Sequence, residues 1–239
     1  MFGERLLRIS RQFIILSGCQ GTTLNSQHPT LMIDEFAEKL RRNLENLPGH
    51  RAQEKMAPEH RLPNEQWERY YPAAKLSGVL LLFYPVGNSI HTVLIQRPTY
   101  DGVHSGQVGF PGGQKEEPDK SMIETALREA NEEVGIDLKS VNVLGQLTQL
   151  YVPPSNFLIT PVVAFSTRQP DFIIDKNEVA EIIEPAIEEL LNDKATGIKG
   201  IRVRKDITIQ APYYDIQGRV VWGATAMIIS ELNEVLRKP

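Results

Sequence analysis

The sequence predicts an α+β fold, or an α/β sandwich, in which strands and helices are mixed around one core. Two short apolar runs, 78–84 and 91–96, are bounded by turn-forming residues, as is typical of buried strands. A segment from about Lys120 to Val134 has apolar residues at helical spacing and ends at Gly135, a common C-terminal cap. With 239 residues, the chain is long enough for one sizeable core with appendages.

Residues 1–31 are polar and irregular, and we expect them to form a disordered N-terminal extension. The segment 16–19 (Leu-Ser-Gly-Cys) resembles a lipoprotein cleavage box and raises the alternative of a lipid anchor at Cys19. A secretory signal, however, needs an apolar stretch of roughly 7–15 residues. The uninterrupted apolar run covers only 13–16, so the extension is favoured over the anchor.

Residues 32–76 predict an amphipathic helix followed by a connector. The apolar residues that share one face of this helix are Ile33, Phe36, Leu40, Leu44 and Leu47. Pro48 and Gly49 end the helix, and the charged segment 50–76, with its scattered prolines, is predicted to lie extended on the domain. An apolar helical face needs a partner, either the core of the same chain or a second copy. The sequence leaves open both intramolecular packing and a homodimer.

The remaining elements alternate between strands and helices. Residues 98–113 contain two prolines and five glycines and are predicted to be a loop. Further strands are predicted at 141–151, 158–165, 201–210 and 219–222, and further helices at 187–191 and 224–236.

Composition excludes several classes of protein. The formal net charge is −4, with 30 acidic and 26 basic residues, which argues against a nucleic-acid-binding protein. A single cysteine can form neither an internal disulfide nor a cysteine metal cluster, which fits a reducing, cytoplasmic location. No run approaches the ~20 apolar residues of a membrane span. The expected partner is a small molecule.

Three glutamates share one face of the helix predicted before Gly135. Glu129, Glu132 and Glu133 stand at positions i, i+3 and i+4. Carboxylates this close repel one another unless a cation lies between them, and Mg²⁺ is bound by oxygen ligands of this kind. Arg128, four residues before Glu132, can orient that carboxylate. Spacing alone also fits a solvated acidic face, which is the commoner explanation of such charge runs.

The segment 128–136 (Arg-Glu-Ala-Asn-Glu-Glu-Val-Gly-Ile) resembles the second half of the Nudix box. In the common form of the box, the first glycine lies about fourteen residues before the arginine, whereas Gly113 lies fifteen residues before Arg128 (128 minus 113). This longer loop resembles the coenzyme A pyrophosphatase branch of the Nudix hydrolases.

The turn that precedes the helix, 110–113 (Phe-Pro-Gly-Gly), lets the backbone come close to a ligand. In the branch that the chain resembles, acidic residues follow this turn at the positions of Glu116 and Asp119. These two residues either complete the outer shell of a metal site or are plain solvated loop acids.

The upstream signature of the same branch is present in part, in 94–97 (Leu-Ile-Gln-Arg) and 106–113. Pro98 stands where a small polar residue is usual, and Gly102 where an arginine is usual, which bears on recognition of the coenzyme A phosphates. Further segments similar to the family are 153–155, 159–163, 177–181 and 221–226, so that the resemblance covers about residues 32–236.

The resemblance implies a Nudix-type α/β/α sandwich with a mixed sheet, in which 77–239 form the Nudix hydrolase domain. It implies hydrolysis of coenzyme A or acyl-coenzyme A to phosphopantetheine and adenosine 3′,5′-bisphosphate, with Mg²⁺ or Mn²⁺ as cofactor. Gly102 keeps open a Nudix pyrophosphatase for another nucleoside diphosphate compound, such as ADP-ribose. A binding module that has lost catalysis is less favoured, because the glutamate set is whole.

The resemblance also implies roles for individual residues. Glu129 and Glu133 are expected to be metal ligands, and Glu132 a ligand or the base that orients the water. Arg128 belongs to the same catalytic group, and Glu178 is a candidate base or metal contact. Arg97 follows a predicted strand, and this position favours contact with a substrate phosphate over pairing with a surface acid. The other residues expected to contact the substrate are His104, Gly112 and Gly113.

Overall fold

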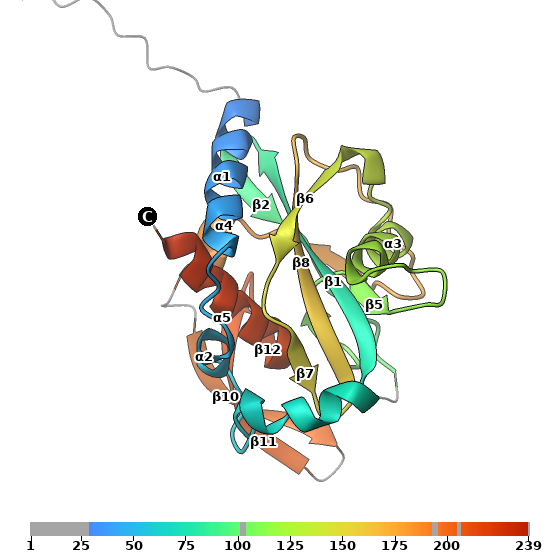
Figure 1. The fold of residues 1–239 in the computed structure, drawn as a ribbon, viewed down its shortest axis with the longest axis vertical. Coiled ribbons are helices and arrows are strands. Elements are labelled where there is room, and N and C mark those ends of the chain that lie inside the picture. Colours follow the sequence, from blue (N-terminus) through green and yellow to red (C-terminus); the bar gives the residue numbers. More distant parts are fainter. Residues whose placement is uncertain (1–28, 101–103, 193–195, 205–206, 239) are drawn as a thin grey trace, which may run out of the picture.

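The computed structural model describes residues 29–100, 104–192, 196–204 and 207–238. Residues 1–28, with Cys19, lie outside this description, and so does Gly102. Within the described residues, helices cover both faces of a mixed sheet (Figure 1). The predicted fold class, an α+β sandwich, is confirmed.

The central sheet has six strands. These are β1 (Lys75–Val86), β2 (Ser89–Thr92), β5 (Gly112–Gln114), β6 (Val141–Gln146), β7 (Leu150–Val152) and β8 (Phe157–Ser166). The neighbours β1 and β8 run parallel, with Val79 beside Pro161, and the other pairs are antiparallel. Strand β1 therefore lies between β8 on one edge and β2 and β5 on the other.

Two smaller sheets of three strands flank the central one. The first has the order β4 (Val108–Gly109), β3 (Leu94–Gln96), β9 (Glu181–Ile183), and the second has the order β10 (Thr196–Arg204), β11 (Ile207–Ile216), β12 (Arg219–Trp222). The two sheets adjoin where β12 contacts β4.

The helices are α1 (Pro29–Leu44), α2 (His50–Glu54), α3 (Met122–Val134), α4 (Ile187–Leu190) and α5 (Gly223–Arg237), with short 3₁₀ turns η1 (Asn64–Gln66), η2 (Glu68–Ala73) and η3 (Leu138–Ser140). Helix α3 lies on one face of the central sheet, and α1 and α5 lie on the other (Figure 1). None of the helices in the described part of the chain is both long and apolar enough to cross a membrane.

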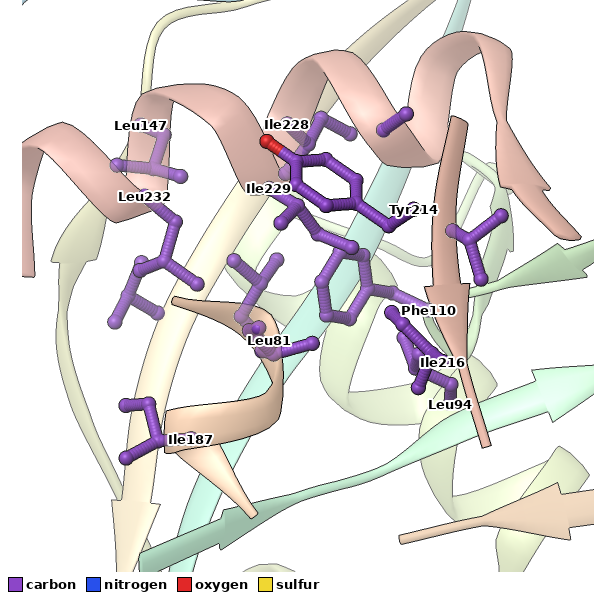
Figure 2. Packing of buried hydrophobic residues seen from close by; sticks show 14 of the residues in the cluster. Leu81, Leu94, Phe110, Leu147, Ile187, Tyr214, Ile216, Ile228, Ile229 and Leu232 are labelled. Carbon is purple, nitrogen blue, oxygen red and sulfur yellow. The ribbon is translucent and has the colours of Figure 1, made fainter. Parts of the chain in front are cut away.

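Side chains of β1 alternate between two hydrophobic clusters, one for each face of the sheet. Leu81 and Phe83 belong to the cluster that includes α1 and α5, and Figure 2 shows Leu81 in this cluster with Ile229 of α5. Leu80 and Leu82 belong to the cluster formed with α3. All four β1 side chains are 0% exposed. Burial on both faces explains why this strand is a continuous apolar run rather than an alternating one.

Helix α1 packs within its own chain. Ile33, Ala37 and Leu40 are buried, and the Phe36 ring meets the ring of Phe83 edge-on at a centroid distance of 5.3 Å. The sequence left open whether the apolar face of this helix packs in its own chain or against a second copy. In the structure it packs against the core of its own chain. The helix begins at Pro29, three residues before the predicted start. A homodimer stays a prediction.

The prediction that 50–76 lies extended is wrong, because the segment contains α2, η1 and η2. Long-range hydrogen bonds of side chains hold these turns in place. Gln53 Nε2 donates to the Thr148 carbonyl at 2.8 Å, and Arg61 Nη2 donates to the Tyr151 carbonyl at 2.6 Å. The turns therefore depend on contacts with β7 and its preceding loop, which leave no local periodicity in the sequence.

Four predicted segments also differ from the structure. The run at 201–210 is not one strand, because it covers the end of β10 and the start of β11, which pair antiparallel. The run at 91–96 divides into β2 and β3, because the chain leaves β1 and pairs with β9 instead. The run at 141–151 divides into β6 and β7, because the Thr148 amide and hydroxyl are bonded to Glu231 of α5. The segment 98–113, predicted as a loop, contains the short strands β4 and β5.

Candidate active site

Helix α3, which bears the predicted carboxylates, lies close against β1. Ser121 caps its N-terminus, where its Oγ accepts a hydrogen bond from the Glu124 amide at 3.2 Å, and Gly135 caps its C-terminus at φ 70°. Gly78 of β1 permits the close approach, because a Cβ there would lie 2.6 Å from the Met122 carbonyl oxygen. The glutamate-bearing face of the helix is thereby fixed relative to the sheet.

The Glu133 carboxylate is buried between α3 and the glycine turn, with its side chain 1% exposed. Its Oε2 accepts a hydrogen bond from the Gly112 amide at 2.7 Å, and its Oε1 accepts one from Arg97 Nη2 at 3.3 Å. Arg97 also donates to the Gly112 carbonyl oxygen at 3.0 Å. Two residues expected to contact substrate thus hold an expected metal ligand in place.

Gly113 lies directly against the Glu129 carboxylate. A Cβ at Gly113 would fall 2.3–2.6 Å from the carboxylate atoms of Glu129, well inside van der Waals contact. A Cβ at Gly112 would fall 2.3 Å from the Gly78 carbonyl oxygen. The absence of a side chain therefore permits a different close contact at each glycine. Gly113 leaves room for the Glu129 carboxylate, and Gly112 leaves room for the backbone of strand β1.

Replacing Gly113 by alanine is expected to reduce the catalytic rate of hydrolysis by about 10- to 100-fold, because the added methyl displaces the Glu129 carboxylate. Gly109→Ala, four residues earlier in strand β4, is the matched control, since a Cβ there meets only Thr225 Oγ1, at 3.4 Å. Steady-state kinetics and thermal melts of both variants test this. Equal rates for the two variants would refute the steric argument.

Arg128 makes hydrogen bonds to three carboxylates. Its Nε and Nη2 donate hydrogen bonds to the Asp119 carboxylate at 3.1 and 3.0 Å. Nη2 also donates to Glu129 at 2.9 Å, and Nη1 donates to Glu132 at 2.9 Å. The expected orientation of Glu132 by Arg128 is thus present. Asp119 is buried and also accepts hydrogen bonds from the Thr125 hydroxyl and the Glu116 amide. In this structure Asp119 anchors Arg128, and Glu116 is an exposed loop residue.

Glu178 lies near the carboxylates of Glu129 and Glu133, on a loop that backbone hydrogen bonds join to α3 and to β3. The Asp175 amide donates to the Glu133 carbonyl oxygen at 3.0 Å, and the Ala180 amide donates to the Gln96 carbonyl oxygen at 2.9 Å. Between these two attachments, the amides of Glu178 and the following residue bond to the Asp175 carbonyl at 3.1 and 2.8 Å. A tight turn therefore presents the exposed Glu178 side chain to the carboxylates of α3.

The carboxylates of Glu129, Glu133 and Glu178 form one cluster, in which one oxygen of each lies within 4.8 Å of the others. We call this the carboxylate cluster. Glu132 is not part of it, because its side chain is 56% exposed and turns toward Arg128. The structure therefore brings together two of the three glutamates expected from helical spacing and adds Glu178, while the ligand role of Glu132 stays a prediction.

His104 lies on the turn that follows the undescribed residues 101–103. It has φ 70°, and its Nδ1 is 3.0 Å from Gln107 Oε1. Among the described residues, no hydrogen bond joins it to the carboxylate cluster. Its expected contact with substrate stays a prediction.

Burial, together with repulsion from neighbouring carboxylates, raises the pKa values of Glu129 and Glu133. Desolvation, the largest cause, raises the pKa of Glu133 to about 7 against the pull of Arg97 and the Gly112 amide, and Glu129 and Glu178 raise it further. Desolvation also raises the pKa of Glu129, although Arg128 opposes it. Arg128 has the opposite effect on Asp119, whose pKa its hydrogen bonds hold far below the usual range.

The cluster fits a hard divalent cation. All its donors are carboxylate oxygens, the ligands that Mg²⁺ and Mn²⁺ prefer, and they bring three carboxylates to one place, where a cation would neutralise their charge. Glu129, Glu133 and Glu178 would hold the ion. Once bound, it would neutralise charge on a pyrophosphate and lower the pKa of a water molecule.

Cation binding is expected to stabilise the fold more at pH 8 than at pH 5.5. The folded pKa of Glu133, about 7, lies above the ordinary value of 4.5, so this group lowers the stability of the metal-free protein progressively as the pH rises through that window. Below it, a proton occupies the carboxyl and competes with the cation. Melting temperatures with and without millimolar Mn²⁺ at the two pH values test this, and an equal increase at both would contradict it.

Comparisons with known proteins identify the family of this chain. The sequence model of the NUDIX domain matches residues 76–202. A protein named uncharacterized Nudix hydrolase NudL from Pectobacterium atrosepticum is 40% identical over 143 residues, which cover 59% of this chain and 73% of the relative. Its namesake from Yersinia enterocolitica is 38% identical, with 59% and 72% covered. The crystal structure of a MutT/nudix family protein from Enterococcus faecalis has a TM-score of 0.46 and 17% identity, with 75% and 72% covered. The chain belongs to the Nudix hydrolase family.

Proposed function

We propose that this chain hydrolyses the pyrophosphate bond of coenzyme A or acyl-coenzyme A, releasing phosphopantetheine and adenosine 3′,5′-bisphosphate. Pyrophosphate hydrolysis is supported by the carboxylate cluster of Glu129, Glu133 and Glu178 beside the glycine turn. The choice of substrate is supported by the sequence pattern of 94–97 and 106–113 and by the extra residue before Arg128.

The chain's own residues have distinct tasks in this reaction. Glu129, Glu133 and Glu178 would hold the cation, and Gly112, Gly113 and Arg128 keep the carboxylates of Glu129 and Glu133 in position. A water molecule attacks one phosphorus, the bridging P–O bond breaks, and the leaving phosphate takes the electron pair. Glu178 has a second carboxylate oxygen besides the one that lies in the cluster, and this oxygen would accept the proton of that water, with Glu132 as the other candidate base.

Arg97 is proposed to bind a substrate phosphate. Its Nη2 is used by Glu133 and Gly112, yet a third of the side chain remains exposed beside the glycine turn. A guanidinium has five N–H donors, so donors remain for a phosphate oxygen. His104 is the other proposed substrate contact on this side, from the loop that leads into β4.

A substrate panel tests the proposal. The purified protein is incubated with Mg²⁺ or Mn²⁺ and, separately, coenzyme A, ADP-ribose, NADH and nucleoside triphosphates. We expect kcat/KM for coenzyme A to exceed the others by about tenfold or more, which is about 1.4 kcal/mol of discrimination. A preparation of the Glu133→Gln variant controls for contaminating enzymes. Turnover of another compound with coenzyme A inert would refute the coenzyme A assignment.

Two alternatives predict other outcomes of the same panel. Gly102, which stands where the coenzyme A branch has an arginine, keeps open another nucleoside diphosphate substrate such as ADP-ribose. A binding module without catalysis would turn over nothing. The intact glutamate set of 129, 132 and 133 argues against that second alternative.

A further inference from the structure

We propose that Asp175 is a positioning residue for the cation site, because its side chain shapes the turn that carries Glu178 to the carboxylate cluster. Asp175 does not belong to the cluster found in the described residues, so it would act through Glu178, the one member that lies outside α3. The helix holds Glu129 and Glu133 relative to each other, whereas the place of Glu178 depends on the fold of its loop. This inference rests on the proposed function, since it concerns the cation that the proposed reaction uses.

The backbone of this loop is attached to the C-terminal end of α3. The Ile173 amide donates to the Val134 carbonyl oxygen at 3.0 Å, and the Asp175 amide donates to the Glu133 carbonyl oxygen at 3.0 Å. Both carbonyls belong to the last turn of the helix, whose carbonyl groups have no partner within the helix. Gly135 leaves room for the loop, because a Cβ there would lie 2.8 Å from the Ile173 carbonyl oxygen. The chain is therefore fixed relative to α3 as far as Asp175.

The turn that follows is organised by Asp175. Its Oδ1 accepts hydrogen bonds from the Asn177 backbone amide at 2.8 Å and from the Asn177 side-chain amide at 2.9 Å. Its carbonyl oxygen accepts bonds from the amides of Glu178 and Val179 at 3.1 and 2.8 Å. An aspartate whose side chain binds the amide two residues later favours a turn in the backbone. Asp175 thus bonds to three successive amides, of which that of Glu178 is the second.

The chain is fixed again directly after Glu178. The Val179 side chain is 1% exposed and belongs to the hydrophobic cluster formed with α3. The Ala180 amide donates to the Gln96 carbonyl oxygen at 2.9 Å. Residues 176–178 therefore connect two fixed points, and the hydrogen bonds of Asp175 bridge this span. Loss of its side-chain bonds would let the span, and with it the Glu178 carboxylate, occupy more positions.

The charge of Asp175 has to be separated from its hydrogen bonds, because a negative charge near the site attracts a cation by itself. Asparagine at 175 removes the charge but keeps a side-chain oxygen that can accept from the Asn177 amide. Alanine removes both the charge and the acceptor. A positioning role therefore predicts that the asparagine variant behaves like the unmodified protein, whereas the alanine variant does not.

The affinity of the full chain for Mn²⁺, measured by electron paramagnetic resonance, tests this role. We expect Asp175→Ala to bind the first Mn²⁺ ion about three- to tenfold more weakly, the range that one lost hydrogen bond produces. Asp175→Asn should stay within about twofold of the unmodified protein. The control, Asp171→Ala, removes the same charge from an exposed position in the same loop and should keep the affinity. Unchanged binding by Asp175→Ala, or an equal loss in Asp175→Asn, would overturn the proposal.

A double-mutant cycle shows whether the effect passes through Glu178. In a Glu178→Gln protein the ligand is already lost, so adding Asp175→Ala should weaken Mn²⁺ binding no further. An equal loss in both backgrounds would mean a general loosening of the fold and would overturn the positioning role. Metal-free melting temperatures check that each variant is folded. The titrations contain no substrate, so the expected Mn²⁺ affinities together with inert coenzyme A would support this inference and refute the proposed function alone.

Discussion

Replacing Glu133 by glutamine is expected to lower kcat/KM by about a thousandfold or more, corresponding to roughly 4 kcal/mol of lost transition-state stabilisation. Glu133 is the most buried carboxylate of the cluster and is held by the Gly112 amide and Arg97. A neutral amide at this position removes one negative charge from the cation site without changing the size of the side chain.

The same substitution should not destabilise the metal-free protein at pH 8. Burial raises the pKa of Glu133 from 4.5 to about 7, so its charged form costs the metal-free fold about 3 kcal/mol above pH 7. Glutamine is neutral and escapes this cost, although its amide nitrogen is less well placed beside Arg97. We therefore expect a melting temperature equal to or above that of the unmodified protein without metal, and a much smaller increase when Mn²⁺ is added.

The matched control is Glu188→Gln, an exposed glutamate on α4 outside the cluster. It should leave both kcat/KM and the Mn²⁺-dependent melting temperature unchanged. Full activity in the Glu133→Gln protein would refute the role of Glu133. A large loss of metal-free stability at pH 8 would instead show that its buried charge is already compensated.

Replacing Arg128 by alanine is expected to cost both stability and activity. The change leaves the buried Asp119 carboxylate without its bidentate partner, and breaking a buried ion pair in this way costs about 3–5 kcal/mol. It also releases Glu129 and Glu132, whose carboxylates Arg128 holds at 2.9 Å. Urea unfolding should show the loss of stability, and kinetics should show a fall in the catalytic rate of about 100-fold.

A double-mutant cycle with Asp119→Asn separates the two effects. In the Arg128→Ala background, a neutral residue at 119 removes the unpaired charge, so most of the lost stability should return. Activity should not return, because Glu129 still lacks its arginine. If stability and activity recover together, the loss of activity in Arg128→Ala follows from unfolding and not from misplacement of Glu129.

The central strands and the long helices are predictable from the sequence because their signals are local. The helix before Gly135 has a continuous apolar face and a capping glycine, and the observed α3 ends at Val134 as expected. The turns in 50–76 have no such signal. They depend on Gln53 and Arg61, whose bonding partners, Thr148 and Tyr151, lie 95 and 90 residues away in the chain.

The residues of the site likewise differ in how well the sequence predicts them. Helical spacing places Glu129 and Glu133 on one face, and the structure keeps them together. The same spacing includes Glu132, but Arg128 draws its carboxylate outward, a contact that competes with the cluster. Glu178 enters through a loop bonded to the Glu133 carbonyl, 45 positions earlier in the chain (178 minus 133). In the sequence, only the family resemblance pointed to Glu178 as a site residue.

The account depends most on a cation bound by Glu129, Glu133 and Glu178, and the affinity for the first Mn²⁺ ion tests this directly. Electron paramagnetic resonance measures free Mn²⁺ during titration of the unmodified protein and of single glutamine variants at 129, 132, 133, 178 and 188. We expect the variants at 129, 133 and 178 to bind about tenfold or more weakly, and those at 132 and 188 to change less. If Glu132→Gln weakens binding and Glu178→Gln does not, the ion lies on the helix face alone, and the carboxylate cluster is not the metal site.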